Sequence, residues 1–301
     1  MRYLAVDIGA SSGRHIVAEI KDGRLSLREV YRFPNGPRRT ADGLVWDADA
    51  LYSHIIEGLK AADAAGLRPD CVGIDTWAVD YVLLDRDGKR IGPAFCYRDE
   101  RGAEAARRFH EVMPFETLYK KTGIQYQPFN TVYQLYADKL SGRLDGAAAM
   151  LMLPDWFNYR LTGVRLQEYT NATSTGMVGA LTDDWDDEIL SAAGVSRSLL
   201  GKVTRPAVKV GSFSPETRRE VGYDAVVMLP ATHDTASAVV AAPVEKGGAY
   251  ISSGTWSLLG AERARAITSE AAMRGNWSNE GGAFGGFRFQ KNIMGLWMVQ
   301  Q

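Results

Sequence analysis

The chain opens with short stretches in which apolar and polar residues alternate, the period of half-buried β-strands. Residues 3–6 and 15–20 flank a turn of small residues, and residues 24–33 continue the β-rich pattern, so we predict an antiparallel meander. A helical period follows over residues 48–65, and residues 71–74 form an apolar run typical of a buried strand. The apolar face of the predicted helix carries Leu51, Ile55, Ile56 and Leu59.

The middle of the chain is predicted to be rich in helices. Residues 103–119 and 131–140 have helical patterns, and residues 146–156 join a buried segment to a further short helix. A polar, Asp-rich stretch at residues 181–188 then predicts exposed chain as far as Ser214.

A repeated motif predicts a duplicated fold. The β pattern returns over residues 225–229, and residues 249–260 then echo residues 4–14, because both have a strand, a Ser-Ser-Gly turn and a strand. Two such hairpins favour an α/β architecture with a cleft between the copies. We expect a first domain over residues 1–246 and the start of a second over residues 247–301, which is too short to complete a covered sheet.

Composition and charge favour a small molecule as the partner. The 301 residues include 35 basic and 36 acidic side chains, a formal net charge of -1, which gives no general attraction for nucleic acid or anionic membranes. Cys71 and Cys96 stand among apolar residues and are expected to be core residues in a reducing compartment. An early charge and the lack of a long apolar run predict a cytoplasmic protein.

The first candidate for binding chemistry is the turn from Asp7 to Arg14. Its small residues allow backbone N–H groups to approach an anion, and the carboxylate of Asp7 is suited to hydrated Mg2+. The turn lacks the Lys-Ser/Thr of a Walker loop, and a strand rather than a helix follows it. A tight hairpin turn without a ligand is the more frequent alternative for this pattern.

The second candidate follows the predicted strand at residues 71–74. The ends of such strands are where α/β proteins bind ligands, and Trp77 is suited to lie against the face of a sugar. Asp75 or Asp80 would then accept hydrogen bonds from hydroxyl groups. A core position for Trp77, with both acids solvated, is equally compatible with the sequence.

The third candidate lies between the strand at residues 225–229 and an apolar helical run at residues 238–242. Phosphoryl transfer to an alcohol needs a carboxylate near the attacking hydroxyl, which makes Asp234 a candidate general base. Spacing alone slightly favours the alternative in which Asp234 or Thr235 caps the helix.

The remaining signals favour structural roles. Four glycines at residues 281–286 predict a flexible hairpin, and the tryptophans Trp256, Trp277 and Trp297 are expected in the core. The four histidines are scattered and predict no metal-binding cluster. No serine or cysteine nucleophile motif stands out, so hydrolase and metalloenzyme functions are weakly supported.

Taken together, these segments resemble the FGGY family of carbohydrate kinases. The motifs that carry the resemblance are residues 5–14 (AVDIGASSGR), 73–77 (GIDTW), 122–125 (TGIQ), 129–131 (FNT), 233–237 (HDTAS), 252–257 (SSGTWS) and 291–297 (KNIMGLW). The resemblance implies the actin- and hexokinase-like α/β fold, related to ribonuclease H, with duplicated domains of which the second is incomplete.

The resemblance implies ATP-dependent phosphorylation of L-rhamnulose at its primary hydroxyl, with Asp234 as the proton acceptor. With the second candidate included, the expected sugar-side residues are Trp77, Ala78, Asp80, His233, Thr235 and Asn292. The residues that it implies for the nucleotide phosphates are Ala10, Ser11, Ser12, Gly13, Arg14 and Thr255. Gln300 is implied to contact ATP, and Asp7 to lie near Mg2+.

The chain departs from the family at Ala78, where members usually have glycine. The added methyl group crowds a bound sugar, so L-fuculose or another deoxy-ketose stays an alternative substrate. Family members also continue well beyond Gln301 through a glycine-rich adenine-binding segment, so we expect this chain to lack part of the nucleotide site. The alternative functions are a non-catalytic sugar-binding or assembly module and an actin-like or chaperone-like ATPase.

Overall fold

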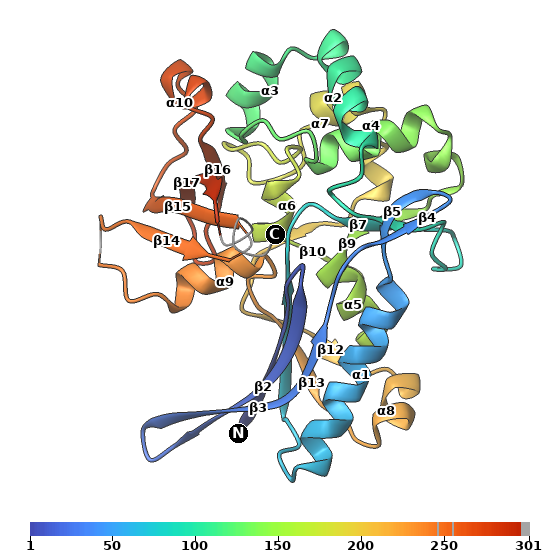
Figure 1. Ribbon diagram of the computed structural model, residues 1–301, viewed down its shortest axis with the longest axis vertical. Coiled ribbons are helices and arrows are strands. Elements are labelled where there is room, and N and C mark those ends of the chain that lie inside the picture. The colour runs from blue at the N-terminus through green and yellow to red at the C-terminus, as the bar shows by residue number, and fades with distance from the viewer. Residues whose placement is uncertain (246, 255, 296–301) are drawn as a thin grey trace.

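A six-stranded mixed sheet forms the centre of the protein in a computed structural model that describes residues 1–245, 247–254 and 256–295 (Figure 1). Its spatial order is β12-β13-β6-β1-β2-β3. Strands β1 to β3 form the predicted antiparallel meander, β6 and β13 run parallel to β1, and β12 is an antiparallel edge. The strands are β1 (Arg2–Ile8), β2 (Ser12–Lys21), β3 (Arg24–Pro34), β6 (Cys71–Thr76), β12 (Val208–Ser212) and β13 (Val226–Leu229).

Helices flank this sheet on both sides. Helices α1, α5 and α8 lie together on one side, and α9 lies on the other, toward a second sheet (Figure 1). Their bounds are α1 (Ala48–Ala64), α5 (Leu153–Thr162), α8 (Pro215–Val221) and α9 (Asp234–Ala241).

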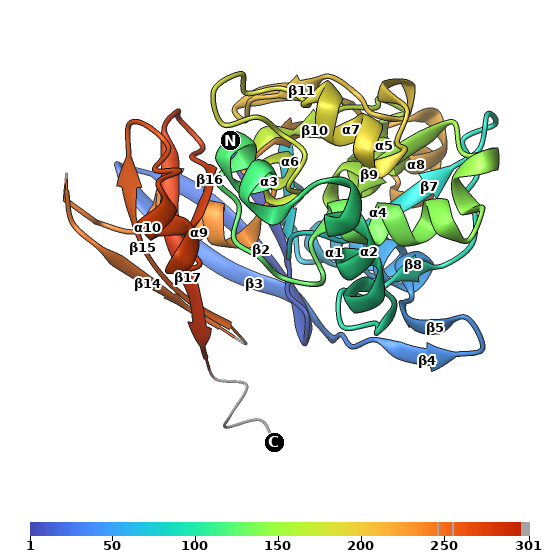
Figure 2. The ribbon, with the colours of Figure 1, turned by 90° about the horizontal axis from the view of Figure 1, so that it is seen from above.

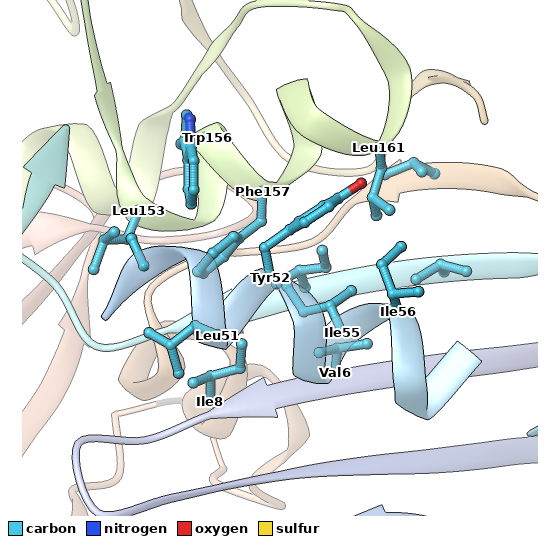
Figure 3. Close-up of a cluster of buried hydrophobic side chains, with 14 of the residues drawn as sticks. Val6, Ile8, Leu51, Tyr52, Ile55, Ile56, Leu153, Trp156, Phe157 and Leu161 are labelled. Atoms are coloured by element: carbon cyan, nitrogen blue, oxygen red, sulfur yellow. The ribbon is translucent and has the colours of Figure 1, made fainter. Parts of the chain in front are cut away.

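The main core fills the space between α1, α5 and the sheet. Helix α1 begins where the side chain of Asp47 accepts a hydrogen bond from the backbone N–H of Ala50 at 3.1 Å, and its apolar face turns inward as predicted. Side chains from strand β1 and from helices α1 and α5 pack together in this layer, among them Val6, Ile8, Leu51, Ile55, Phe157 and Leu161 (Figure 3). This packing fixes the end of β1, which carries the first candidate turn.

A second hydrophobic cluster lies among the helices beside the sheet (Figure 2). The helices of this region are α2 (Arg101–Val112), α3 (Phe115–Thr122), α4 (Thr131–Leu140), α6 (Tyr169–Ser174) and α7 (Asp187–Ala193). In the described part of the chain, two strand pairs and one three-stranded sheet lie outside the two larger sheets: β7 (Tyr81–Leu84) with β9 (Ala149–Met152), β10 (Gln167–Glu168) with β11 (Val203–Thr204), and β4 (Arg38–Thr40), β5 (Gly43–Trp46) and β8 (Ala94–Phe95).

The second sheet is antiparallel throughout, in the order β14-β15-β17-β16. Its elements are β14 (Tyr250–Ser253), β15 (Trp256–Arg263), α10 (Glu270–Arg274), β16 (Ser278–Gly281) and β17 (Phe287–Met294). The predicted hairpin at the glycine-rich segment is confirmed. Glycine is required there at Gly286, because its φ is +66° and a Cβ would lie 2.6 Å from the carbonyl oxygen of Arg263.

Two predictions about the elements were wrong. The single helix over residues 103–119 is two helices, because the chain breaks at Met113 and Pro114 and the proline starts α3. The chain leading to Ser214 is not simply exposed, since α7 buries Ile189 and Leu190 and β12 completes the main sheet. The helix at residues 131–140 is confirmed.

Cys71 and Cys96 are both buried and free, as predicted. Among the described helices, none has the length and apolar character needed to cross a membrane. The cytoplasmic location stays a prediction.

His15 gives the fold a testable pH dependence. Burial lowers the pKa of His15 from 6.5 to about 4, so between these values the unfolded chain binds a proton that the folded protein does not. The free energy of unfolding therefore falls as the pH falls from 6.5 toward 4. Urea titrations at pH 7 and pH 4 measure this change. Between the two pH values, the free energy of unfolding of His15→Leu should fall by roughly 3 kcal/mol less than that of the parent. Equal losses in both proteins would contradict this role, and any constant packing cost of leucine cancels between the two pH values.

Candidate active site

A cavity of about 760 Å³ lies where the carboxyl ends of the parallel strands face the second sheet. Its volume is in the range of small-molecule sites, and strand ends are the usual ligand position in α/β folds. The backbone N–H of Thr76, at the end of β6, donates to the carbonyl of Thr232 at 2.9 Å. This bond joins the loop after β6 to the loop after β13, and so brings the second and third candidate segments together.

The turn between β1 and β2 lines the cavity through Ala10, Ser11, Ser12 and Arg14. Asn35 holds this turn by donating its side-chain N–H to the carbonyl of Gly9 at 2.8 Å.

Gly13 is the one residue of the predicted phosphate group from Ala10 to Arg14 that does not line the cavity. A Cβ there would lie 2.1 Å from the ring of Phe33, so Gly13 serves the packing of β2 on β3.

Three carboxylates converge on the cavity. Asp7 and Asp75 are direct neighbours in the parallel pairing of β1 with β6, and Asp234 begins α9 beyond the next strand. Burial, together with the negative charges of Asp7 and Asp234, raises the pKa of Asp75 well above its usual value. Arg14 pairs with Asp7 at 2.8 Å and offsets part of this charge. The cluster therefore favours a cation or a proton.

Asp7 and Asp75 are suitable donors for Mg2+. Hard cations of this kind use one or two carboxylates and complete their shell with water and phosphate oxygens. Within residues 1–245, 247–254 and 256–295, no group of three or more His, Cys, Asp or Glu side chains is arranged to hold a metal. The fit is therefore to a cation that arrives with a phosphate ligand, and not to a metal held by protein side chains alone.

The segment after β6 forms the wall opposite the second sheet through Trp77, Ala78 and Val79. Val79 has a φ of +70°, a strained value for a β-branched residue. Its carbonyl accepts hydrogen bonds from the hydroxyl of Thr131 at 2.7 Å and from the amide of Gln134 at 3.2 Å. These contacts hold the strained segment in place beside the cavity.

Asp80 does not line the cavity, which differs from the expectation that it contacts sugar. Its carboxylate is fully enclosed and accepts hydrogen bonds from the indoles of Trp46 and Trp77, the amide of Gln134 and the backbone of Tyr97. Burial raises the pKa of Asp80 to about 6 against the effect of these donors. Asp80 fixes the orientation of Trp77 from behind, and sequence alone does not distinguish that position from a cavity carboxylate.

His233, Asp234 and Thr235 line the cavity together at the start of α9. His233 is the capping residue and Asp234 the first residue of the helix, so the alternative in which Asp234 or Thr235 caps it was wrong. The Asp234 carboxylate accepts a hydrogen bond from the backbone of Thr235 at 2.5 Å. Burial raises the pKa of Asp234, and the charge of Asp7 adds to this effect.

The second sheet contributes Trp256, Glu280 and Asn292 to the cavity. Trp256 was expected in the core and instead forms part of the cavity wall, whereas Trp277 stacks on Phe289 as a packing residue. Thr255 and Gln300, which were expected on the nucleotide side, lie outside the described part of the chain, as does Trp297, which was expected in the core.

Among the described residues, two buried polar atoms in the cavity wall have no hydrogen-bond partner: Oε1 of Gln125 and Oδ1 of Asn292. Such atoms are rare in folded proteins unless a ligand or water satisfies them. Asn292 was predicted. Gln125 was not assigned a role, although it belongs to the motif at residues 122–125.

The hairpins β1–β2 and β14–β15 face the same cavity from two sides, as the repeated motif predicts. A mixed sheet with a meander, flanking helices and a second hairpin-led sheet across a cleft defines the actin- and hexokinase-like α/β class. The model for the N-terminal domain of the FGGY family of carbohydrate kinases matches residues 2–241, and the chain belongs to that family.

Named relatives extend along almost the whole chain. It is 46% identical over 300 residues to a rhamnulokinase of Oceanobacillus iheyensis, an alignment that covers 99% of this chain and 64% of the relative. A rhamnulokinase of Halalkalibacterium halodurans is 47% identical over 304 residues, with 100% of this chain and 65% of the relative covered. The chain therefore spans just under two thirds of the length of these relatives.

Solved structures support the fold at low sequence identity. A ligand-bound xylulose kinase from Lactobacillus acidophilus superposes with a TM-score of 0.83 at 16% identity, covering 97% of this chain and 60% of that one. The glycerol kinase of Plasmodium falciparum with ADP gives a TM-score of 0.77 at 16% identity, covering 99% and 63%.

The structural role of Asp80 can be tested against Asp234. Asp80→Ala leaves three buried donors without an acceptor, the two indoles and the backbone N–H of Tyr97, and should lower the free energy of unfolding by about 3 kcal/mol. Asp234→Ala, at a partly exposed position, should change it by less than about 1 kcal/mol. Guanidinium titrations of both variants measure this difference. Similar, small losses for the two would mean that Asp80 is not a structural carboxylate.

Proposed function

We propose that this chain forms the sugar-binding cleft and catalytic centre of an ATP-dependent kinase that phosphorylates L-rhamnulose at its primary hydroxyl. The observation that carries the proposal is the convergence of Asp7, Asp75 and Asp234 on one cavity that both hairpin turns also line. The identity of 46% and 47% to proteins named rhamnulokinase supports L-rhamnulose over other ketoses.

In this proposal, Asp234 accepts the proton of the sugar's primary hydroxyl. At the same time the hydroxyl oxygen bonds to the γ-phosphorus of ATP, and the bond between that phosphorus and the leaving ADP breaks. The raised pKa of Asp234 suits a group that takes up a proton during the reaction. His233, Thr235 and Asn292 bind hydroxyl groups of the sugar, and Trp77 with Ala78 lies against its face. Asp80 contributes only through the position of Trp77.

The phosphates of ATP lie at the turn from Ala10 to Arg14, whose small residues allow backbone N–H groups to approach an anion and whose guanidinium group suits one. Gly13 supports that turn by packing, and Thr255 and Gln300 belong to the same nucleotide side. When bound, Mg2+ supplies positive charge to the phosphates, and Asp7 would hold it with Asp75 as its neighbour. Residues 1–246 form the sugar-binding catalytic domain, and residues 247–301 begin the nucleotide-binding domain.

Calorimetric titration with ketoses tests the substrate. The 301-residue chain should bind L-rhamnulose about tenfold more tightly than L-fuculose, because a changed hydroxyl configuration loses about one hydrogen bond in the same cavity. Binding of neither ketose would contradict the proposed substrate class.

Asp234→Asn tests the catalytic role with almost no change in shape. With ATP and Mg2+ present, the variant should turn over L-rhamnulose about 100-fold to 10,000-fold more slowly than the parent. Its affinity for the sugar should stay within a few fold. Undiminished turnover would remove Asp234 as the base. A parent that binds both the sugar and ATP without turnover would instead support the non-catalytic sugar-binding alternative.

A further inference from the structure

Gln125 places an unpaired amide in the wall of the cavity. The residue is 5% exposed and lines the cavity, and within the described part of the chain no group donates a hydrogen bond to its Oε1 atom. Burying an amide oxygen without a donor costs stability, so such a group calls for a ligand or a water that supplies the donor. None of the functional roles assigned above uses this side chain.

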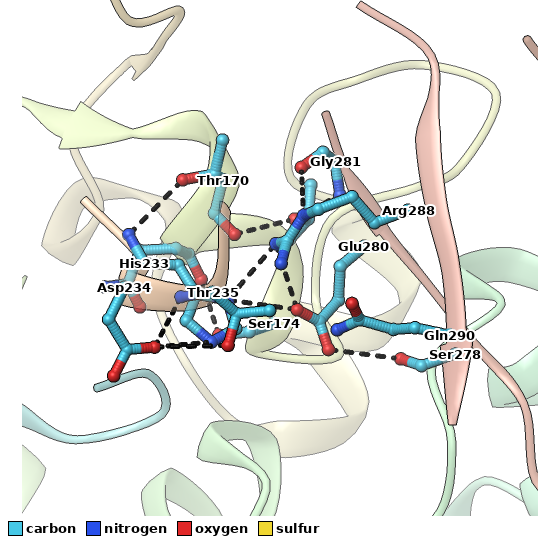
Figure 4. A network of polar contacts seen from close by, with 12 residues as sticks. Thr170, Ser174, His233, Asp234, Thr235, Ser278, Glu280, Gly281, Arg288 and Gln290 are labelled. Atoms are coloured by element: carbon cyan, nitrogen blue, oxygen red, sulfur yellow. Dashed lines mark hydrogen bonds and ion pairs between the residues drawn. The ribbon is translucent and has the colours of Figure 1, made fainter. Parts of the chain in front are cut away.

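The carboxylate of Glu280, in the same cavity, already has partners in the protein (Figure 4). Its Oε2 atom lies 3.0 Å from Nδ1 of His233 and accepts a hydrogen bond from Nη2 of Arg288 at 3.1 Å. Its Oε1 atom accepts one from the hydroxyl of Ser278 at 3.4 Å. The unpaired amide of Gln125 therefore indicates a ligand contact more directly than this buried ion pair does.

Contacts with β16 and with the residues just before it fix the loop on both sides of Gln125. The carbonyl of Gly123 accepts hydrogen bonds from the backbone N–H and from the side-chain amide of Asn279, both at 2.9 Å. The backbone N–H of Tyr126 donates to Oδ1 of Asn276 at 2.8 Å, and the carbonyl of Tyr126 accepts from the side-chain amide of Asn276 at 3.2 Å. The side chain of Gln125 takes no part in these contacts, so they hold it in place and leave it available to a ligand.

The same loop is joined to the wall that we assign to the sugar. The side-chain amide of Asn130, which also lines the cavity, donates to the carbonyl of Gln125 at 2.8 Å. The amide of Gln134 then donates both to the carbonyl of Phe129 at 2.9 Å and to that of Val79 at 3.2 Å. One side chain thus ties the end of this loop to the strained segment after β6, which carries Trp77 and Ala78.

We propose that Gln125 is a substrate-binding residue whose side-chain amide forms hydrogen bonds with a hydroxyl group of the ketose, other than the hydroxyl that is phosphorylated. An amide has one group that accepts and one that donates, and a hydroxyl does both, so the two match. The amide is also neutral and adds no charge beside Asp7, Asp75 and Asp234. A sugar without a hydroxyl at this place leaves the buried amide unpaired, which makes Gln125 a determinant of specificity. This inference rests on the proposed function for the identity of the sugar.

Calorimetry on the 301-residue chain with Gln125→Leu tests the contact. Leucine is similar in size but cannot form hydrogen bonds, so the variant should bind L-rhamnulose about tenfold more weakly than the parent. The matched control is Gln127→Leu in the same loop, which changes a side chain that does not line the cavity and should stay within twofold of the parent. Titration with L-fuculose locates the contact: an equal loss places it at a hydroxyl that the two ketoses share, and a smaller loss at the one where they differ.

Urea titration without sugar separates a ligand contact from a structural role. Because the acceptor of Gln125 is unpaired in the free protein, replacing it with leucine should leave the unfolding midpoint no lower than that of the parent. A midpoint that falls together with the sugar affinity would mean that Gln125 supports the fold, and would overturn its role as a ligand.

NMR of the parent with 15N-labelled glutamine gives a readout that does not depend on the stability of a variant. The side-chain amide signal of Gln125 should shift when L-rhamnulose is added, and that of Gln127 should not. Each signal is assigned by its loss in the corresponding leucine variant, or in Gln125→Asn if Gln125→Leu does not fold.

The outcomes separate this inference from the proposed function. Unchanged sugar affinity in Gln125→Leu, or an unshifted amide signal in a parent that binds sugar, overturns the role of Gln125 and leaves the proposed function intact. A parent that binds L-fuculose but not L-rhamnulose, with the same loss in Gln125→Leu, supports Gln125 and contradicts only the proposed substrate. A parent that binds neither ketose overturns both.

Discussion

The site depends on a buried carboxylate that never reaches the cavity. Glu168 is fully enclosed, and five donors converge on it: the backbone and hydroxyl of Thr170, the backbone of Asn171, and the backbone and hydroxyl of Thr232. A buried carboxylate without donors would cost several kcal/mol, so this arrangement strongly favours one geometry. It fixes the start of α6 and the loop that carries His233 relative to each other.

This constraint reaches both walls of the cavity. The carbonyl of Thr232, a residue held by Glu168, accepts the hydrogen bond from the N–H of Thr76 that joins the loops after β6 and β13. The hydroxyl of Thr173 in α6 accepts a hydrogen bond from the N–H of Gly281 in β16. The strain at Val79, of order 1–3 kcal/mol, persists because its surroundings are fixed in this way. Close placement of like charges in Asp7 and Asp75 is a second cost. Both costs fall at the cavity, where proteins commonly give up stability for function.

The sequence predicted those parts of the fold that have a local signal. The meander, the helix at residues 131–140 and both hairpins follow from periodicity and turn residues. Pro114 is a local signal for the break between α2 and α3 that the helical prediction over residues 103–119 did not use. The difference between the expected and the observed position of Asp80 has another cause. Asp75 and Asp80 follow the same strand, and only the tertiary fold places indole and amide donors around the second and leaves the first facing Asp7. Trp256 was misassigned for the same reason.

The contact of Glu280 and Arg288 with His233 could not be predicted from the sequence, because it arises from strand register. A one-residue shift in the pairing of β16 with β17 would turn both side chains to the other face of the sheet and leave His233 without a partner. The glycines of the connecting turn, which sequence treats as flexible, hold that register, since Gly282 donates its N–H to the carbonyl of Gly286 at 3.0 Å. A hairpin that seems only structural in the sequence therefore places an ion pair against a histidine of the cavity wall.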